Sequence, residues 1–224
     1  MSNGKASFII SIDLELAWGV YDKINSNIIK KINEEEREIC KKLLYIFDEN
    51  ELTVTWAVVA ALLDSRSISI DKENQKAWYS PDILENILKS KTKHLIASHS
   101  YGHKEFNISN KEEIVEDFEK SKFIFKKNDI KTDVFVFPRN QVFHLDILKQ
   151  FDFKTFRSVD ISWYKKIYNY NKYLGKISNI IDKTFPIKTN SIRPSVNSLG
   201  LTEIPTSILL ISKNGIRSLV SNLC

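Results

Sequence analysis

The chain has few cysteines and no long apolar run, the features typical of disulfide-bonded and membrane-anchored proteins. Only two of its 224 residues are cysteines. Cys40 falls in an amphipathic helical pattern and Cys224 is the last residue, so a disulfide framework is not expected. No apolar run approaches the roughly 20 residues of a membrane-spanning helix, and the apolar run at residues 8–10 is too short for a signal peptide. These absences predict a cytoplasmic protein with no membrane span.

The chain also lacks a dense block of one charge. Its 33 Lys and Arg against 28 Asp and Glu give a net charge of +5, and the basic residues are spread along the sequence rather than gathered beside aromatics. A nucleic-acid-binding protein would show a clustered basic footprint, so no nucleic-acid partner is expected. The hydrophobic content of 42% is ordinary for a globular protein, and the length suits one domain over residues 1–224.

Histidine is scarce, which makes its placement informative. The chain has four histidines, and two of them, His99 and His103, lie in one segment directly after a short apolar run, residues 94–98. Gly102 between them favours a tight loop over a regular helical turn. Two neutral imidazoles at this spacing suit a divalent metal such as zinc, which also needs a third ligand and an open position for water. Two solvent-facing histidines on a polar loop are the alternative.

A carboxylate pair follows another apolar run. Residues 7–12 read as a buried strand, and Asp13 and Glu15 come directly after them. If the strand continues to Glu15, both side chains point to the same side of the sheet. One carboxylate can then bind a metal while the other acts as a base. Capping of the next element is the alternative for either residue taken alone.

Apolar strands alternate with amphipathic helices along the chain, which indicates a parallel α/β fold. The expected strands are residues 7–12, 53–59, 94–98, 134–137, 153–156 and 201–205, and the expected helices are 28–49, 80–88, 109–127 and 145–151. The unusual residues fall just past predicted strand ends, where a parallel barrel carries its active site. They are Asp13, Glu15, His99, His103, Arg139, Asn140 and Asp160.

The chain resembles the polysaccharide deacetylase family, the NodB-homology carbohydrate esterases. The segments that carry the resemblance are residues 11–15, 55–59, 99–103, 137–140 and 160–163. The histidine segment is the most specific of them. The resemblance implies a distorted, incomplete (β/α) barrel. It also implies metal-dependent hydrolysis of N-acetyl groups on an amino sugar or a polysaccharide intermediate, with a divalent metal, usually zinc, as cofactor.

The resemblance also implies residue roles. Asp13 matches the catalytic base, and Glu15, His99 and His103 match the metal ligands. Arg139 is expected to orient Asp13 or to stabilise negative charge, although the family places its arginine two residues before the proline, where this chain has Val136. The residues expected to contact the carbohydrate are Trp18, Asn140, Asp160 and Trp163, the tryptophans by stacking on sugar rings unless they belong to the core.

One family feature is missing. The resemblance implies a late histidine that acts as general acid, yet no histidine follows His144. The chain also ends soon after the strand expected at residues 201–205, so we expect a domain that lacks its final barrel elements. Two alternatives to an active N-deacetylase therefore stay open: a catalytically impaired sugar-binding remnant, and an amidase that acts on a non-sugar substrate. The sequence predicts no oligomeric state.

Overall fold

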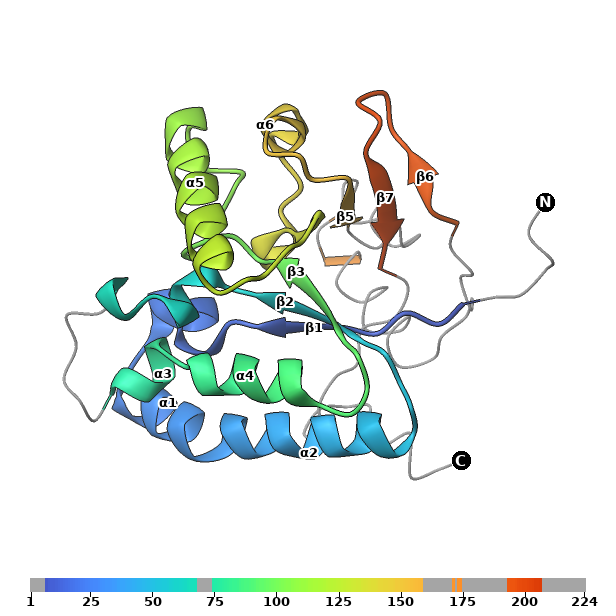
Figure 1. The fold of residues 1–224 in the computed structure, drawn as a ribbon. Helices are drawn as coiled ribbons and strands as arrows, with labels where there is room; N and C mark the ends of the chain where they lie inside the picture. The colour runs from blue at the N-terminus through green and yellow to red at the C-terminus, as the bar shows by residue number, and fades with distance from the viewer. Residues whose placement is uncertain (1–6, 68–73, 159–170, 172, 175–192, 207–224) are drawn as a thin grey trace.

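The computed structural model describes residues 7–67, 74–158, 171, 173–174 and 193–206 (Figure 1). Its strands form one sheet of seven in the order β1-β2-β3-β4-β5-β7-β6. All neighbouring pairs are parallel except β6 with β7. The strands are β1 (Ser11–Leu14), β2 (Thr55–Val58), β3 (Leu95–Ser98), β4 (Val134–Val136), β5 (Thr155–Ser158), β6 (Ser195–Val196) and β7 (Thr202–Pro205). The parallel sheet confirms the predicted α/β class.

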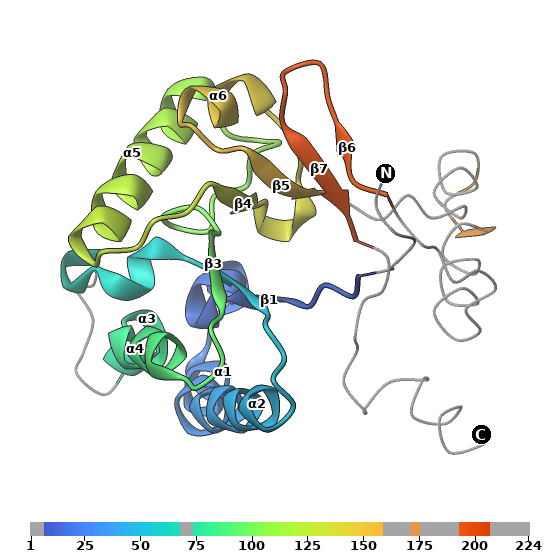
Figure 2. The same cartoon turned by 45° about the vertical axis from the view of Figure 1, so that its right-hand side comes forward.

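The helices lie outside a curved row of strands, so the arrangement is an incomplete barrel (Figure 2). Helices near the start of the chain cover β1 to β3, and α5 and α6 cover the following strands (Figure 1). The α-helices are α1 (Ser26–Lys31), α2 (Arg37–Glu49), α3 (Gln75–Trp78), α4 (Pro81–Lys89), α5 (Lys111–Lys127) and α6 (Leu145–Gln150). The 3₁₀-helices are η1 (Leu16–Lys23), η3 (Ala60–Leu63), η4 (Ser65–Ser67) and η5 (Pro138–Asn140). The element η2 (Ile32–Glu36) is a π-helix.

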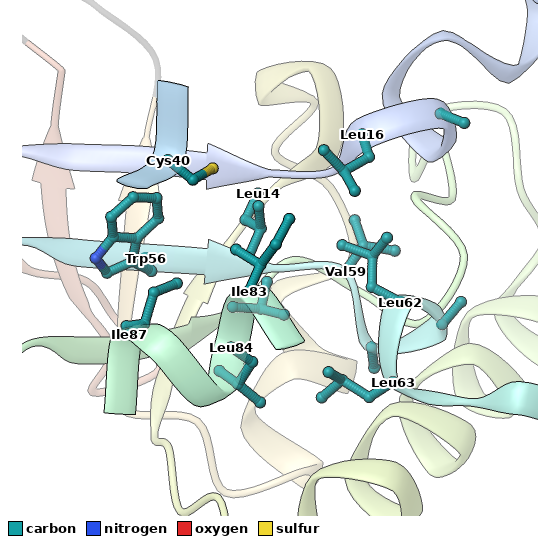
Figure 3. Packing of buried hydrophobic residues seen from close by; sticks show 14 of the residues in the cluster. Leu14, Leu16, Cys40, Trp56, Val59, Leu62, Leu63, Ile83, Leu84 and Ile87 are labelled. Carbon is teal, nitrogen blue, oxygen red and sulfur yellow. The ribbon is translucent and has the colours of Figure 1, made fainter. Parts of the chain in front are cut away.

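Two apolar cores hold the sheet to its helices. The first lies between β1 to β3 and helices α2 and α4, where the fully buried Trp56 shares one cluster with Ile83 and Ile87 (Figure 3). The second is rich in phenylalanine and lies under α5 and α6, with Phe118 and Phe135 at its centre. The opposite face of the sheet carries small buried residues, among them Ala57 and Ala97. Bulky side chains therefore face the helices, and small ones leave room on the concave side.

Several expected boundaries differ in the structure, among them the start of α5 and the extent of β5. The helix expected to start at residue 109 begins at Lys111, behind a capping box formed by Asn110 and Glu113. The hydroxyl of Ser109 donates to the Glu105 carbonyl, and the helix begins two residues later than expected. The fifth strand begins at Thr155 and includes Arg157, whereas the sequence placed its end at Phe156. In the described part of the chain, no helix is long and apolar enough to span a membrane.

Candidate metal centre

The candidate ligands meet at the carboxyl ends of β1 and β3, the two strands on either side of β2. Glu15 follows β1, and His99 and His103 follow β3. The two histidines are almost completely buried, at 0% and 1% exposure. Ser100 and His103 adopt positive φ values of 66° and 55°, a conformation that is uncommon for residues other than glycine. This bend turns the loop back, so that both imidazoles face Glu15.

The three ligand atoms are close enough to share one ion. Glu15 Oε2 lies 2.9 Å from His103 Nε2 and 3.2 Å from His99 Nε2. All three ligand atoms lie within 4.8 Å of one another. Ligands at 2.0–2.1 Å from a tetrahedral zinc stand about 3.3–3.4 Å apart. The observed spacing is therefore close to that of a two-histidine, one-carboxylate zinc site.

The proton positions in the site also fit a cation. His99 Nδ1 lies 2.8 Å from the Val136 carbonyl oxygen, which can only accept, so this nitrogen carries a proton. In the neutral ring, His99 Nε2 then points a lone pair at the Glu15 carboxylate. Either a second proton on the imidazole or a metal ion must separate the two acceptors. A divalent cation satisfies both groups at once.

Electrostatics keep Glu15 ionised. Burial alone would raise the pKa of its carboxyl, but the hydrogen bonds and charges of His103 and His99 outweigh that effect and hold the pKa well below its ordinary value. An ionised carboxylate is the form that binds a metal. The second ring nitrogen of His103, Nδ1, is buried and has no hydrogen-bond partner among the described residues.

Asp13 is paired with an arginine that the sequence did not single out. Arg157 Nη1 donates to Asp13 Oδ1 at 2.6 Å, and Nη2 donates to Oδ2 at 2.7 Å. Arg157 also donates to the Ser11 hydroxyl at 3.0 Å and to Asn140 Oδ1 at 3.3 Å. A two-bond guanidinium contact fixes the plane of a carboxylate. Asp13 Oδ2 lies 4.0 Å from His99 Nε2, so the oriented carboxylate stands beside the candidate ligands.

Arg139, which was expected to orient Asp13, lies elsewhere. Its guanidinium pairs with Asp22 and Glu105, each at 2.7 Å, and lies 5.7 Å from the ring centroid of Tyr21. These contacts tie together the loops that follow β1, β3 and β4. The guanidinium on Asp13 thus comes from Arg157 in β5. Its signal in the sequence is a charged residue directly after the apolar Phe156, just past the end of the predicted strand.

The expected carbohydrate-binding residues have different surroundings. Asn140 is exposed and joins the site through its bond with Arg157. Trp18 donates from Nε1 to the Trp78 carbonyl at 3.0 Å and packs edge-on against the Trp78 ring, so much of it belongs to the structural framework beside the histidine loop. The expectations for Asp160 and Trp163 lie outside the described residues.

The fold and the site together define a class: a parallel α/β barrel protein with two histidines and a carboxylate at the strand ends. The polysaccharide deacetylase family model matches residues 25–155, which is more than half of the chain. The chain therefore belongs to the polysaccharide deacetylase family. The match includes His99, His103 and Arg139, whereas Asp13 and Glu15 precede it and Arg157 follows it.

Solved structures share the fold. A structure described as a polysaccharide deacetylase from Mycobacterium smegmatis is 13% identical, with a TM-score of 0.56. The alignment covers 89% of this chain and 58% of that one, so the chain spans little more than half the length of that relative. This likeness supports the barrel-type fold and, at such low identity, nothing finer.

Two further structures are more distant. IcaB from Ammonifex degensii has a TM-score of 0.40 at 12% identity and covers 54% of each chain. The Streptococcus pyogenes deacetylase PplD in complex with acetate has a TM-score of 0.42 at 8% identity, covering 70% of this chain and 85% of that one. A search of curated proteins finds no significant match.

Proposed function

We propose that this chain is a metal-dependent hydrolase that removes N-acetyl groups from an amino sugar or a polysaccharide intermediate. One observation carries the proposal: in a member of the deacetylase family, Glu15, His99 and His103 converge on one point with Asp13 beside them. These three ligands leave a further position of a tetrahedral ion for water or substrate. Two histidines and a carboxylate favour zinc among the divalent metals.

Each residue has a separate task in this reaction. A bound zinc supplies Lewis acidity, which lowers the pKa of water towards about 7 and polarises the acetyl carbonyl. Asp13 takes the proton of the attacking water on Oδ2, the oxygen nearer the histidine pair. Arg157 holds that carboxylate in one orientation through its paired bonds. The Val136 carbonyl holds the ring of His99 with Nε2 directed at the ligand cluster.

The test measures zinc content after dialysis together with acetate release from N-acetylated chitooligosaccharides. Wild type is expected to retain one zinc per chain and to release acetate. His103→Ala is expected to lose the metal, and Asp13→Asn to keep the metal but lose turnover. His144→Asn is the matched control, because it removes a histidine at the start of α6 and Asn tolerates the local φ of 53°. Zinc retained in full by His103→Ala, or turnover retained by Asp13→Asn, would refute the assignment.

A second candidate is a domain that binds metal and carbohydrate without turnover. It is favoured by the sequence, in which no histidine follows His144 to act as the general acid. In that case wild type retains zinc and releases no acetate. Binding of the same oligosaccharides, measured by calorimetry, would still depend on His103 if the metal contacts the sugar.

A further inference from the structure

The loop that carries the two histidines has an unusual backbone. Ser100 and His103 both have positive φ values, although neither is a glycine. Such conformations persist only where the surrounding structure determines them. Two neighbouring amides inside this loop, those of Tyr101 and Gly102, must also find acceptors, because the loop is largely buried.

One buried carboxylate accepts both amides. Asp117 lies in α5 and is 5% exposed. Its Oδ1 accepts from the Tyr101 N–H at 2.8 Å, and its Oδ2 accepts from the Gly102 N–H at 3.0 Å. Burial raises the pKa of the Asp117 carboxyl, and the two backbone N–H groups oppose that rise because they stabilise the ionised form. The two oxygens of one side chain therefore accept hydrogen bonds from consecutive peptide groups at the centre of the histidine loop.

The carbonyl side of the same loop is held by backbone alone. Ala60 N–H donates to the Ser100 carbonyl at 3.0 Å, and Ala61 N–H donates to the Tyr101 carbonyl at 2.9 Å. These bonds from η3 do not depend on any side chain. We call these four hydrogen bonds, two from backbone and two to Asp117, the clamp of the loop. Substitution of Asp117 can remove its two bonds while the two backbone bonds from η3 remain.

We propose that Asp117 is a positioning residue of the metal site, whose carboxylate holds the loop so that His99 and His103 converge on Glu15 before any ion binds. This inference rests on the proposed function of the site. Asp117 contacts neither candidate ligand side chain in the hydrogen bonds observed, and it acts through the backbone between them. Its role in α5 alone would be ordinary helix packing, which predicts no effect on coordination.

The variant Asp117→Asn tests this in the full chain. Asn keeps the shape and one acceptor oxygen, but its amide group is a donor that meets one of the two N–H groups. We expect zinc affinity to fall by about 10- to 100-fold, the range found for outer-shell partners of metal ligands. With Co²⁺ in place of zinc, the visible absorption bands should shift, because the ligand geometry changes. A merely structural role would leave these bands unchanged.

The matched control is Asn110→Ala. It removes the side-chain cap of the same helix, which typically costs stability, but it leaves the Asp117 carboxylate in place. Weaker zinc binding in Asp117→Asn with wild-type affinity in Asn110→Ala supports the proposal. Equal affinity in Asp117→Asn and wild type overturns it. Loss of affinity in both variants also overturns it, because general loosening of α5 would then explain the effect.

A measurement on the wild type covers the case in which Asp117→Asn does not fold. Amide hydrogen exchange at Tyr101 and Gly102 should be slow in the metal-free protein, since the clamp exists without the ion. Fast exchange there overturns the inference while the metal site stands. The variant His103→Ala tests the metal site separately from the role of Asp117. If His103→Ala binds zinc as tightly as wild type, the metal site itself is wrong, whatever Asp117→Asn does.

Discussion

Gly19 should be essential for metal binding, because no side chain fits at this position. Gly19 follows Glu15 by four residues in η1. A Cβ added there would lie 2.6 Å from Cγ of Glu15 and closer still to its carboxyl group. Real Cβ contacts are not that short, so in Gly19→Ala the Glu15 side chain must rotate away. Its Oε2 would then leave the two histidine nitrogens.

The size of the effect follows from the loss of one ligand in three. Changes that only disturb partners of a ligand cost about 10- to 100-fold in metal affinity. Displacing the Glu15 carboxylate itself should therefore weaken zinc binding by at least about 100-fold, or about 2.8 kcal/mol. The fold should survive, since the Gly19 φ lies outside the left-handed region. Alanine in a compatible conformation adds about 0.4–1 kcal/mol of stability through the unfolded state.

The assay is zinc titration by calorimetry, with thermal unfolding of each variant in chelator. Gly102→Ala is the matched control: its added Cβ would meet only Trp18 Cζ3, at an ordinary 3.7 Å, although Gly102 lies between the two histidines. We expect loss of zinc binding in Gly19→Ala and near wild-type binding in Gly102→Ala. Wild-type affinity in Gly19→Ala would refute the assignment of Glu15 as a ligand.

Three further predictions concern Arg157, Cys40 and Tyr101. Arg157→Lys keeps the charge but cannot form the paired bonds to Asp13, so acetate release should fall about 10- to 100-fold with zinc content unchanged; full activity would contradict the orienting role. Burial, with a smaller contribution from a nearby carboxylate, raises the pKa of the Cys40 thiol to about 11, so in a variant whose other cysteine is replaced, Ellman's reagent should react at pH 8 only as fast as the protein unfolds. Burial, together with Asp64, raises the pKa of Tyr101 to about 12 from an ordinary 10.0. The folded state then keeps this proton longer than the unfolded state, so the stability contribution is present below pH 10 and is lost as the pH rises towards 12. The free energy of unfolding of Tyr101→Phe, measured in urea, should fall less between pH 10 and pH 12 than that of wild type. Identical pH profiles of the two proteins would exclude this contribution of Tyr101.

Much of the site lies within reach of sequence reasoning. Glu15, His99 and His103 each follow a short apolar strand, and parallel strands bring their carboxyl ends to one edge of a sheet. That topological rule explains why residues 84 positions apart, Glu15 and His99, form a close contact. Local pattern and chain topology are sufficient here, because the relevant strands, β1 and β3, both pair with β2.

Arg157 shows where such reasoning stops. The sequence ended the fifth strand at Phe156, but β5 continues to Ser158, and strand ends are the least certain part of any sequence-based prediction. β1 and β5 are also not neighbours in the sheet. Only the curvature of the sheet brings Arg157 across the concave side to Asp13, and no local pattern encodes that curvature.

The sequence by itself determined the α/β class and the family, and it singled out the residues proposed to hold a metal. These depend on periodicity and on residue chemistry, which are local. Only the tertiary structure decided which arginine meets Asp13, that Gly19 leaves room for Glu15, and that Asp117 holds the histidine loop. Each of these depends on the distance between elements far apart in the chain, which packing sets and the order of residues does not reveal.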